Sequence, residues 1–424
     1  MTATEAHRAI EAIWRIESAK VIAVVARMVR DVGVAEELAQ DAFLTALKQW
    51  PEAGVPQNPG AWLTATAKNR AIDLMRRQKR GQEKYAEIGR EMERDQAAMP
   101  DLDSALDDEV GDELLGLIFT ACHPVLSTDA RVALTLRLIG GLTTDEIARA
   151  FLAAEPTVAQ RIVRAKKTLG EAQPDFEVPR GAERAGRLAS VLQVIYLIFN
   201  EGYSATAGED WIRPQLCEEA LRLGRILAGL APQEPEVHGL VALMELQASR
   251  LKARVGPRGE PVLLLKQDRG RWDHMQIRRG LMALQKGEAL AGAEPGPYLL
   301  QAAIAACHAR ARTGDETDWA RIAAIYGRLG ALAPSPVVEL NRAVAVAMAE
   351  GPAAGLAIAD AIAGEPALKD YHLLPSVRGD LLAKLGRFEE AGAEFARAAA
   401  LTRNERERAL LMERAEAAAR GEVA

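Results

Sequence analysis

The sequence has few of the residues that build disulfide frameworks, metal sites and aromatic cores. Aromatic residues make up 4% of its 424 residues, and its three cysteines are Cys122, Cys217 and Cys307. An odd, scattered set without a CxxC pair supports neither a disulfide framework nor a zinc site, so we expect free thiols in the cytosol. No apolar run is long enough to span a bilayer, and the charged N-terminal stretch MTATEAHRAIEAIW is unlike a signal peptide. We therefore expect a cytoplasmic protein with no membrane contact, no metal and no cofactor.

Motifs of catalysis are also absent from the sequence. It contains no phosphate-binding loop, no GxSxG motif and no cysteine–histidine nucleophile signature. The polar residues of 263–277 include acids and a histidine, but Asp273 and His274 are adjacent and lack the i, i+4 spacing of a helical metal pair. The sequence therefore predicts a protein that is not an enzyme and has no catalytic residues.

The residues that are abundant favour helices. Ala, Leu, Arg and Glu dominate, and an all-α fold is the prediction that follows. Residues 82–111 are rich in acids and lack apolar periodicity, which indicates a solvated linker. A second break at 173–184 contains two prolines. We predict folded domains at 1–81, 112–172 and 183–424.

The stretch Leu142–Leu169 has the pattern of two short helices around a tight turn. Thr144 is placed to cap the first helix, and Pro156 suits the first turn of the second, where its missing N–H costs nothing. The exposed face of the second helix is polar and basic, with Gln160, Arg161, Arg164, Lys166 and Lys167. This geometry inserts into a DNA major groove, where Arg and Gln read base edges and Lys and Arg neutralise phosphates. A basic helical surface without a DNA-binding role would show the same pattern.

Two further helices are expected before the acidic linker. The first, at 34–49, is expected to turn Leu38, Ala42, Phe43 and Leu47 inward and to expose Glu36, Glu37, Gln40 and Asp41. The second, at 60–77, carries Trp62 among basic residues. An aromatic face beside basic charge is what a single-stranded nucleic-acid platform needs. Taken alone, this helix is better explained by a tryptophan in the core of an amphipathic helix.

Three motifs together resemble an extracytoplasmic-function (ECF) sigma factor, the two-domain promoter-recognition subunit of bacterial RNA polymerase. AEELAQDAFLTALKQW (35–50) is similar to region 2.2, NPGAWLTATAKNRAIDLMRR (58–77) to regions 2.3 and 2.4, and the stretch 134–169 to region 4. The motifs occur in the family's order. The chain has Ala159 where the family often has a basic residue, and Glu155 begins the recognition helix, which suggests a distinct −35 sequence.

The resemblance implies roles for individual residues. Docking on the clamp helices of the largest polymerase subunit falls to Leu38, Gln40, Asp41 and Phe43. Opening of the −10 element falls to Asn58, Trp62, Asn69, Arg70, Arg76 and Arg77. Reading of the −35 element falls to Thr157, Gln160, Arg161, Arg164 and Lys167. Asp73 is expected to pair with one of the arginines of its own helix. The implied partners are promoter DNA and core RNA polymerase, at its clamp helices and flap region.

The remainder of the chain, 183–424, extends beyond an ordinary ECF factor. Apolar periodicity predicts helices at 187–199, 216–230, 236–251, 298–311 and 319–332. Residues 381–401 are close to one tetratricopeptide-type helical pair, and 334–362 form a weaker unit. The whole chain thus resembles the ECF subgroup with a tetratricopeptide-like regulatory extension.

A polar cluster in the extension is a candidate regulatory site: Asp268, Arg269, Arg271, Trp272, Asp273 and His274. We expect the extension to contact the sigma part of the same chain or to bind a protein or ligand. An alternative function fits the same helix–turn–helix, namely a repressor or activator fused to a helical-repeat scaffold. Such a regulator has no need of a polymerase-docking helix followed by an aromatic, basic helix, so residues 35–77 discriminate between the two functions.

Overall fold

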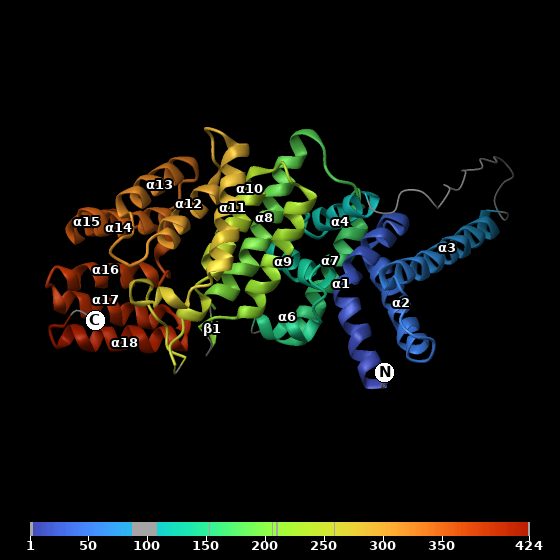
Figure 1. Cartoon of the computed structure of the whole chain (residues 1–424), viewed down its shortest axis with the longest axis horizontal. Helices are drawn as coiled ribbons and strands as arrows, with labels where there is room; N and C mark the ends of the chain where they lie inside the picture. Colours follow the sequence, from blue (N-terminus) through green and yellow to red (C-terminus); the bar gives the residue numbers. More distant parts are fainter. Residues whose placement is uncertain are drawn as a thin grey trace. The chain divides into compact units, whose positions relative to one another are not determined.

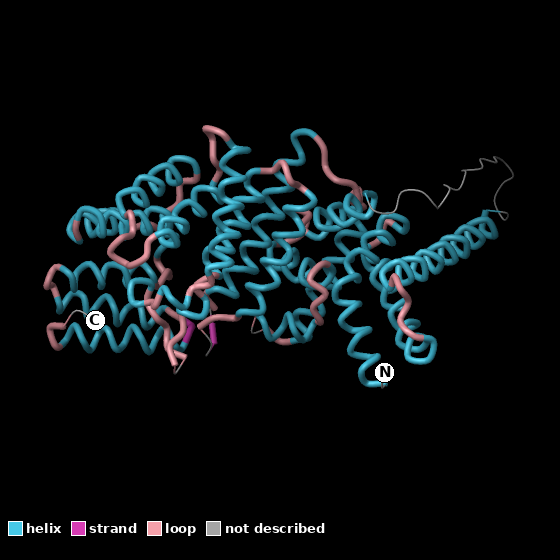
Figure 2. The backbone as a smooth tube through the Cα atoms, viewed as in Figure 1, coloured by secondary structure: helices cyan, strands magenta, loops and turns pink. Residues whose placement is uncertain are grey.

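The computed structural model of the protein describes residues 3–86, 108–151, 153–205, 207–208, 211–257 and 259–422. Regular structure in these ranges is almost entirely helical (Figure 1), so the predicted all-α class is confirmed. Figure 2 shows the exception, a two-residue parallel pairing of β1 (Ala207–Gly208) with β2 (Arg403–Asn404). The chain forms two compact units, Met1–Ile195 and Tyr196–Ala424.

The first unit begins with three helices, α1 (Ala3–Val29), α2 (Val32–Ala53) and α3 (Pro59–Ala86). Asp31 starts α2 because its carboxylate accepts hydrogen bonds from the N–H groups of Gly33 and Val34, at 2.7 and 3.0 Å. α3 continues into the predicted acidic linker 82–111, and the next described helix begins at Asp108. The rest of that linker lies outside the described residues.

A stripe of small side chains lines the face of α2 that packs against α1 and α3. Its members are 0% exposed: Ala35, Ala39, Ala42 and Ala46. The expectation that Leu38, Phe43 and Leu47 point inward is wrong, because all three are only half-buried. Alanines let helix axes approach closely, and the larger apolar side chains are then left at the rim of the contact.

The remainder of the first unit contains the helix–turn–helix. Its helices are α4 (Asp108–Ala121), α5 (Thr128–Leu138), α6 (Thr144–Ala150) and α7 (Glu155–Ala172). Thr143, rather than the predicted Thr144, caps α6. Its hydroxyl accepts from the N–H of Glu146 at 3.1 Å, and the Glu146 carboxylate accepts from the N–H of Thr143 at 2.7 Å. This reciprocal pair is a capping box. Pro156 lies in the first turn of α7, as predicted.

The helix α8 (Gly181–Tyr203) begins in the first unit and crosses its boundary. Its first half packs on the helix–turn–helix part through buried polar contacts. Arg187 donates to the carbonyl of Phe119 at 3.0 Å, and Ser190 donates to the carbonyl of Cys122 at 2.7 Å. Ser190 also accepts from Arg131 at 2.5 Å. The first unit therefore extends along the chain past residue 183, where the sequence placed the start of the extension.

The second unit is a succession of helices that pack on their sequence neighbours. Phe395 is 2% exposed, and the backbone of Gly379 lies so close that a Cβ there would be 2.9 Å from the Phe395 ring. The two helices that carry Gly379 and Phe395 therefore pack closely, with a small residue against a large one. The helices that follow α8 are α9 (Pro214–Leu230), α10 (Pro235–Ala248), η1 (Leu251–Ala253), η2 (Leu264–Lys266), η3 (Arg269–Arg271), α11 (His274–Ala291), α12 (Pro297–Arg310), α13 (Trp319–Leu332), α14 (Pro336–Glu350), α15 (Pro352–Ala361), η4 (Pro366–Leu368), α16 (Leu373–Lys384), α17 (Phe388–Leu401) and α18 (Glu405–Ala419).

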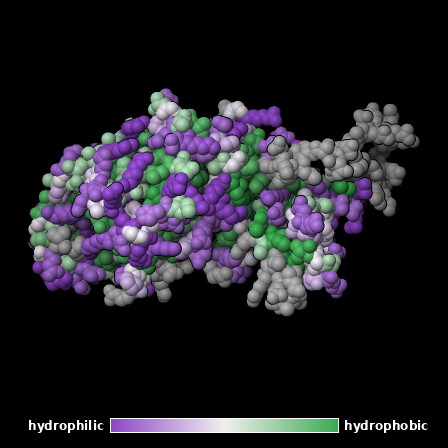
Figure 3. Space-filling model, viewed as in Figure 1, coloured by the Kyte–Doolittle hydropathy of each residue, from purple (hydrophilic) through white to green (hydrophobic). Residues whose placement is uncertain are grey.

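Hydrophilic and hydrophobic side chains are interspersed over the face seen in Figure 3. None of the described helices is both long enough and apolar enough to cross a bilayer.

We predict that Ser190→Ala destabilises the protein by about 1–3 kcal/mol, because it leaves the buried carbonyl of Cys122 without its donor. Gln193→Ala is the control, since Gln193 is exposed one turn along the same helix and its loss changes stability by less than about 0.5 kcal/mol. Differential scanning calorimetry of the full chain measures both variants. Equal melting temperatures for the two variants would contradict the structural role of α8 in the first unit.

Candidate nucleic-acid interfaces

The second helix of the helix–turn–helix, α7, is held by one apolar face. Val158, Ile162, Ala165 and Leu169 are each at most 5% exposed. Four of the predicted −35 residues, Thr157, Gln160, Arg164 and Lys167, are exposed on α7. Lys167 has a weak contact with Glu171, at 3.8 Å along the same helix. The polar face of α7 is therefore free to meet DNA.

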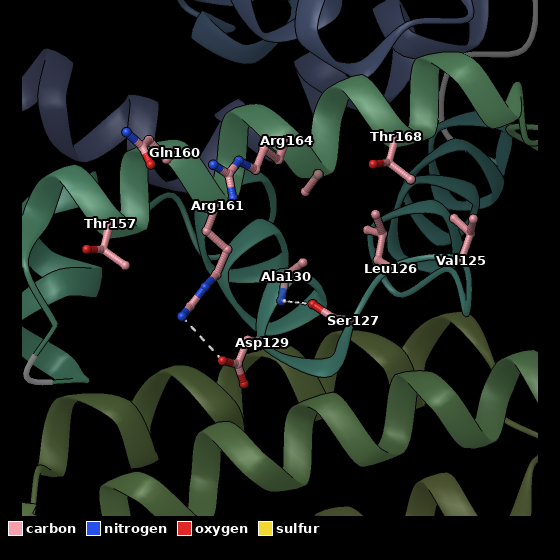
Figure 4. A pocket seen from close by; sticks show the side chains of 11 residues that line it. Val125, Leu126, Ser127, Asp129, Ala130, Thr157, Gln160, Arg161, Arg164 and Thr168 are labelled. Carbon is pink, nitrogen blue, oxygen red and sulfur yellow. Dashed lines mark hydrogen bonds and ion pairs between the residues drawn. The ribbon is translucent and has the colours of Figure 1, made fainter.

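A cleft of about 440 Å³ runs beside this face, between α7 and the start of α5 (Figure 4). Arg161, the fifth predicted −35 residue, is half-buried here because it reaches across to Asp129, with 3.3 Å between guanidinium and carboxylate. The Asp129 side chain is 71% exposed, so water weakens the ion pair. The ion pair thus holds the Arg161 side chain in one orientation, and breaking it costs little free energy.

Lys166 departs from its expected place on the DNA-facing side of α7. Its ammonium pairs with the carboxylate of Glu36 on α2, and Arg137 on α5 donates to the same carboxylate at 2.7 Å. Glu36 is only 4% exposed, which corrects the prediction that it is solvated. A buried carboxylate needs cations or hydrogen-bond donors, and two helices of the helix–turn–helix part supply them.

The residues predicted to open the −10 element differ in their exposure and in their hydrogen-bond and ion-pair partners. Asn69, Arg76 and Arg77 are exposed. Asn58 caps α3, accepting from the N–H of Ala61 at 3.1 Å, a role that the sequence analysis missed. Asp73, expected to pair with an arginine of its own helix, is not the partner of Arg70, which instead binds a residue of α2.

Trp62 lies at the edge of the core. It is half-buried and meets the ring of the buried Trp50 edge-on, with 5.2 Å between ring centroids. One side of the indole is therefore packed, and the rest is accessible to a base. This position combines the two interpretations that the sequence left open.

The predicted polymerase-docking residues lie on and beside the exposed face of α2. Asp41 is exposed and pairs with Arg70 at 2.9 Å, while Gln40 donates to Glu36 at 3.0 Å. Phe43 stacks on Trp14 with 4.8 Å between ring centroids, and Leu38 is half-buried. The sequence analysis missed an exposed apolar residue beside this pair, which is Leu44 at 52% exposure. The clue was available, because the alanine stripe already fills the inner face of α2.

The polar cluster at 268–274 is built largely into the second unit. Asp268 caps η3 through the N–H of Gly270, and Asp273 caps α11 through the N–H groups of Met275 and Gln276. Trp272 is 5% exposed, and Arg269 lies over its ring and donates to the carbonyl of Ala311 at 2.8 Å. Arg271 and His274 are exposed.

The three thiols are unsuited to reaction. All are buried, and burial raises the pKa of Cys122 to about 11 and that of Cys217 to about 12, so both stay protonated at neutral pH. Among the residues described, no group of three His, Cys, Asp or Glu side chains could hold a metal ion.

Comparison with known proteins decides between the two functions left open by the sequence. Residues 15–81 match the Sigma-70 region 2 family, and residues 117–169 match the Sigma-70 region 4 family. The chain is a sigma factor. As an alternative sigma factor it directs transcription initiation, a function that involves core RNA polymerase and promoter DNA. Residues 187–288 of this sigma factor match a family of unknown function, DUF6596.

Relatives of the sigma factor fall into two groups. An uncharacterized protein of Rhizobium meliloti is 44% identical over 91% of this chain and 90% of its own length. The probable ECF RNA polymerase sigma factor SigI of Mycobacterium tuberculosis is 29% identical over 39% of this chain and 56% of its own length. The ECF RNA polymerase sigma factor SigK of Mycobacterium ulcerans is 29% identical over 34% of this chain and 74% of its own length. No solved structure is significantly similar to the sigma factor.

We predict that Asp129→Asn strengthens binding to a −35 duplex roughly two- to fivefold, because it frees Arg161 from an exposed ion pair worth at most about 1 kcal/mol. Arg161→Ala and Arg164→Ala should each weaken binding, by about 1–3 kcal/mol for whichever makes a bidentate base contact. Fluorescence anisotropy with a duplex selected in vitro measures these changes.

Two controls separate release of Arg161 from a general loss of negative charge. Asp175→Asn makes the same charge change at an exposed position after α7 and should leave affinity unchanged. Asp129→Asn should give no gain when Arg161 is already alanine. A gain of the same size in the Arg161→Ala background would show that the ion pair is irrelevant to DNA binding.

Proposed function

We propose that the sigma factor binds core RNA polymerase through α2, opens the −10 element with α3 and reads the −35 element with α7. The observation that carries this proposal is the exposure of four polar side chains on α7, whose opposite face is buried in the first unit. These side chains are Thr157, Gln160, Arg164 and Lys167. These are side chains that read base edges and neutralise phosphates.

The polymerase surface on α2 is proposed to combine charge with apolar area. Asp41 supplies an exposed carboxylate, and the stacked pair of Phe43 and Trp14 lies with Leu44 on the outside of the alanine stripe. Apolar side chains ringed by polar groups are typical of protein interfaces. The clamp helices of the largest polymerase subunit are the proposed partner of this surface, and the flap is the proposed partner of the region 4 part.

The −10 surface is proposed to lie along α3, from Asn58 to Arg77. Extruding a base from duplex DNA costs a few kcal/mol. Stacking on the accessible side of Trp62 and phosphate contacts from Arg76 and Arg77 would offset that cost. Arg70 is the exception on α3, since it is engaged with Asp41 and with the hydroxyl of Thr45 at 2.6 Å.

The second unit is proposed to regulate the sigma factor, as a tetratricopeptide-like extension would. The tight Gly379–Phe395 contact between α16 and α17 supports this helical-repeat interpretation. The exposed members of the polar cluster, which are available to a partner, are Asp268, Arg271, Asp273 and His274.

The proposed function is tested by adding the purified full chain to core polymerase and measuring promoter-specific transcripts. We predict that Asp41→Arg abolishes most of this transcription, because it reverses the charge of the docking surface and places a cation beside Arg70. The fold should persist, since an exposed ion pair contributes at most about 1 kcal/mol.

Glu52→Arg is the matched control, an exposed charge reversal roughly 16 Å further along α2. It should transcribe normally. Normal transcription by Asp41→Arg would remove the docking assignment. Promoter binding without any need for polymerase would instead favour the repressor or activator.

We predict that Trp62→Ala impairs open-complex formation while closed promoter binding is nearly unchanged. Permanganate footprinting of the −10 region and filter binding measure the two steps separately. Trp62→Phe keeps both the edge contact with Trp50 and a face for a base, so it should restore much of the melting. Normal melting by Trp62→Ala, together with a lower melting temperature of the protein, would assign Trp62 to the core alone.

A further inference from the structure

Two arginines of the second unit share one aromatic ring. The guanidinium carbon of Arg254, just after η1, lies 3.6 Å from the centroid of the Tyr203 ring, and that of Arg250 lies 5.6 Å from it. The Arg254 guanidinium is also 5.4 Å from the ring of Trp211. Tyr203 ends α8, Trp211 precedes α9, and the two arginines follow α10, so three separate segments meet at this point.

These two arginines lack the partners that other arginines of the second unit have. Arg213 pairs with Glu201 at 2.5 Å, and Arg225 pairs with Glu245 at 2.6 Å. Among the described residues, no carboxylate lies within ion-pair distance of Arg250 or Arg254. Arg254 is only 8% exposed, and its Nε is buried without a hydrogen-bond partner, as is the Nε1 of Trp211.

The charged groups at this point are all cationic and repel one another. Burial lowers the pKa of the Arg250 guanidinium, Tyr203 offsets part of this through a hydrogen bond, and the neighbouring charge of Arg254 lowers the pKa further. Burial and the charge of Arg250 likewise lower the pKa of Arg269. Burial, with Arg250 and Arg269 nearby, lowers the pKa of His308 to about 3, so this histidine is neutral at physiological pH. Buried like charges without a counter-ion are costly, and such clusters occur where a ligand supplies the missing charge.

We propose that Arg250 and Arg254, on the face of Tyr203, form a binding site for a small anion that carries a phosphoryl or carboxylate group. The anion accepts hydrogen bonds from the guanidinium groups of both arginines. Guanidinium forks suit both oxyanion groups, which have similar spacing of their oxygens. Tyr203, Trp211 and Arg250 are half-buried, so part of each side chain is in contact with solvent. The proposal gives the extension a ligand and does not depend on the promoter contacts.

The experiment is isothermal titration of the full chain with two probes, pyrophosphate for the phosphoryl class and citrate for the carboxylate class. Binding of at least one probe at a single site, with a Kd below about 1 mM, is expected. Arg250→Gln should weaken it about tenfold or more, since it removes charged hydrogen-bond donors. Arg254→Lys keeps the charge but loses the planar fork, and it should also weaken binding.

Arg342→Gln is the matched control, because Arg342 lies in the same unit but is paired with Glu339 at 2.5 Å. It should bind both probes as the wild-type chain does. The probe that binds decides between the two sources of the oxyanion. Absence of saturable binding by both probes overturns the proposal, and so does binding that Arg250→Gln and Arg254→Lys leave intact.

The melting temperature without any anion gives a second, independent readout. Relief of like-charge repulsion should leave the melting temperature of Arg250→Gln equal to or above that of the wild-type chain, as for a residue retained for binding rather than stability. Addition of the bound probe should raise the melting temperature of the wild-type chain and have little effect on Arg250→Gln. A fall of several degrees for anion-free Arg250→Gln would assign the arginines to packing on Tyr203 and contradict the site.

Discussion

The buried carboxylate of Glu36 is the interaction on which the arrangement of the first unit depends. It brings α2 of the region 2 part together with α5 and α7 of the region 4 part, through Arg137 and Lys166. Burying this carboxylate without its cations would cost several kcal/mol of folding free energy. The ion pairs therefore favour the arrangement in which α5 and α7 pack beside α2. Lys166 follows Arg164 by two residues, which places it roughly 200° around α7. The contact therefore holds the helix from the side opposite Arg164 and leaves the proposed DNA-reading residues exposed.

The alanine stripe of α2 has a second consequence for function. Because small side chains fill the contact with α1 and α3, the larger apolar residues of α2 cannot also be buried there. Phe43 is partly covered by the ring of Trp14, whereas Leu44 remains exposed to water. Close packing inside the unit and an apolar surface outside it thus arise from the same choice of residues. A surface of this kind is stable in the free protein only because it is small, and it gains most when a partner covers it.

Local patterns could be predicted from the sequence, and long-range pairings could not. The helix Trp319–Leu332 begins and ends where its apolar periodicity does, because Asp318 caps it by accepting from the N–H of Arg321. The exposed polar residues of α7 follow from the same kind of periodicity. Glu36 was misjudged because its partner Arg137 is 101 residues away, and no local pattern reports such a contact. The helix α11 was missed because the polar residues at its start looked like a site, whereas Asp273 is its cap.

The partners of the arginines separate structural from functional roles throughout the protein. Arg213 faces Glu201 with both side chains 11% exposed, an arrangement that is costly to break and serves the fold. Arg70 and Arg161 face exposed carboxylates, so water already screens their ion pairs. Arg250 and Arg254 face no described carboxylate although Arg254 is buried, and both lie against the ring of Tyr203. The exposure of the opposing carboxylate, or its absence among the described residues, therefore separates three classes of arginine in this chain.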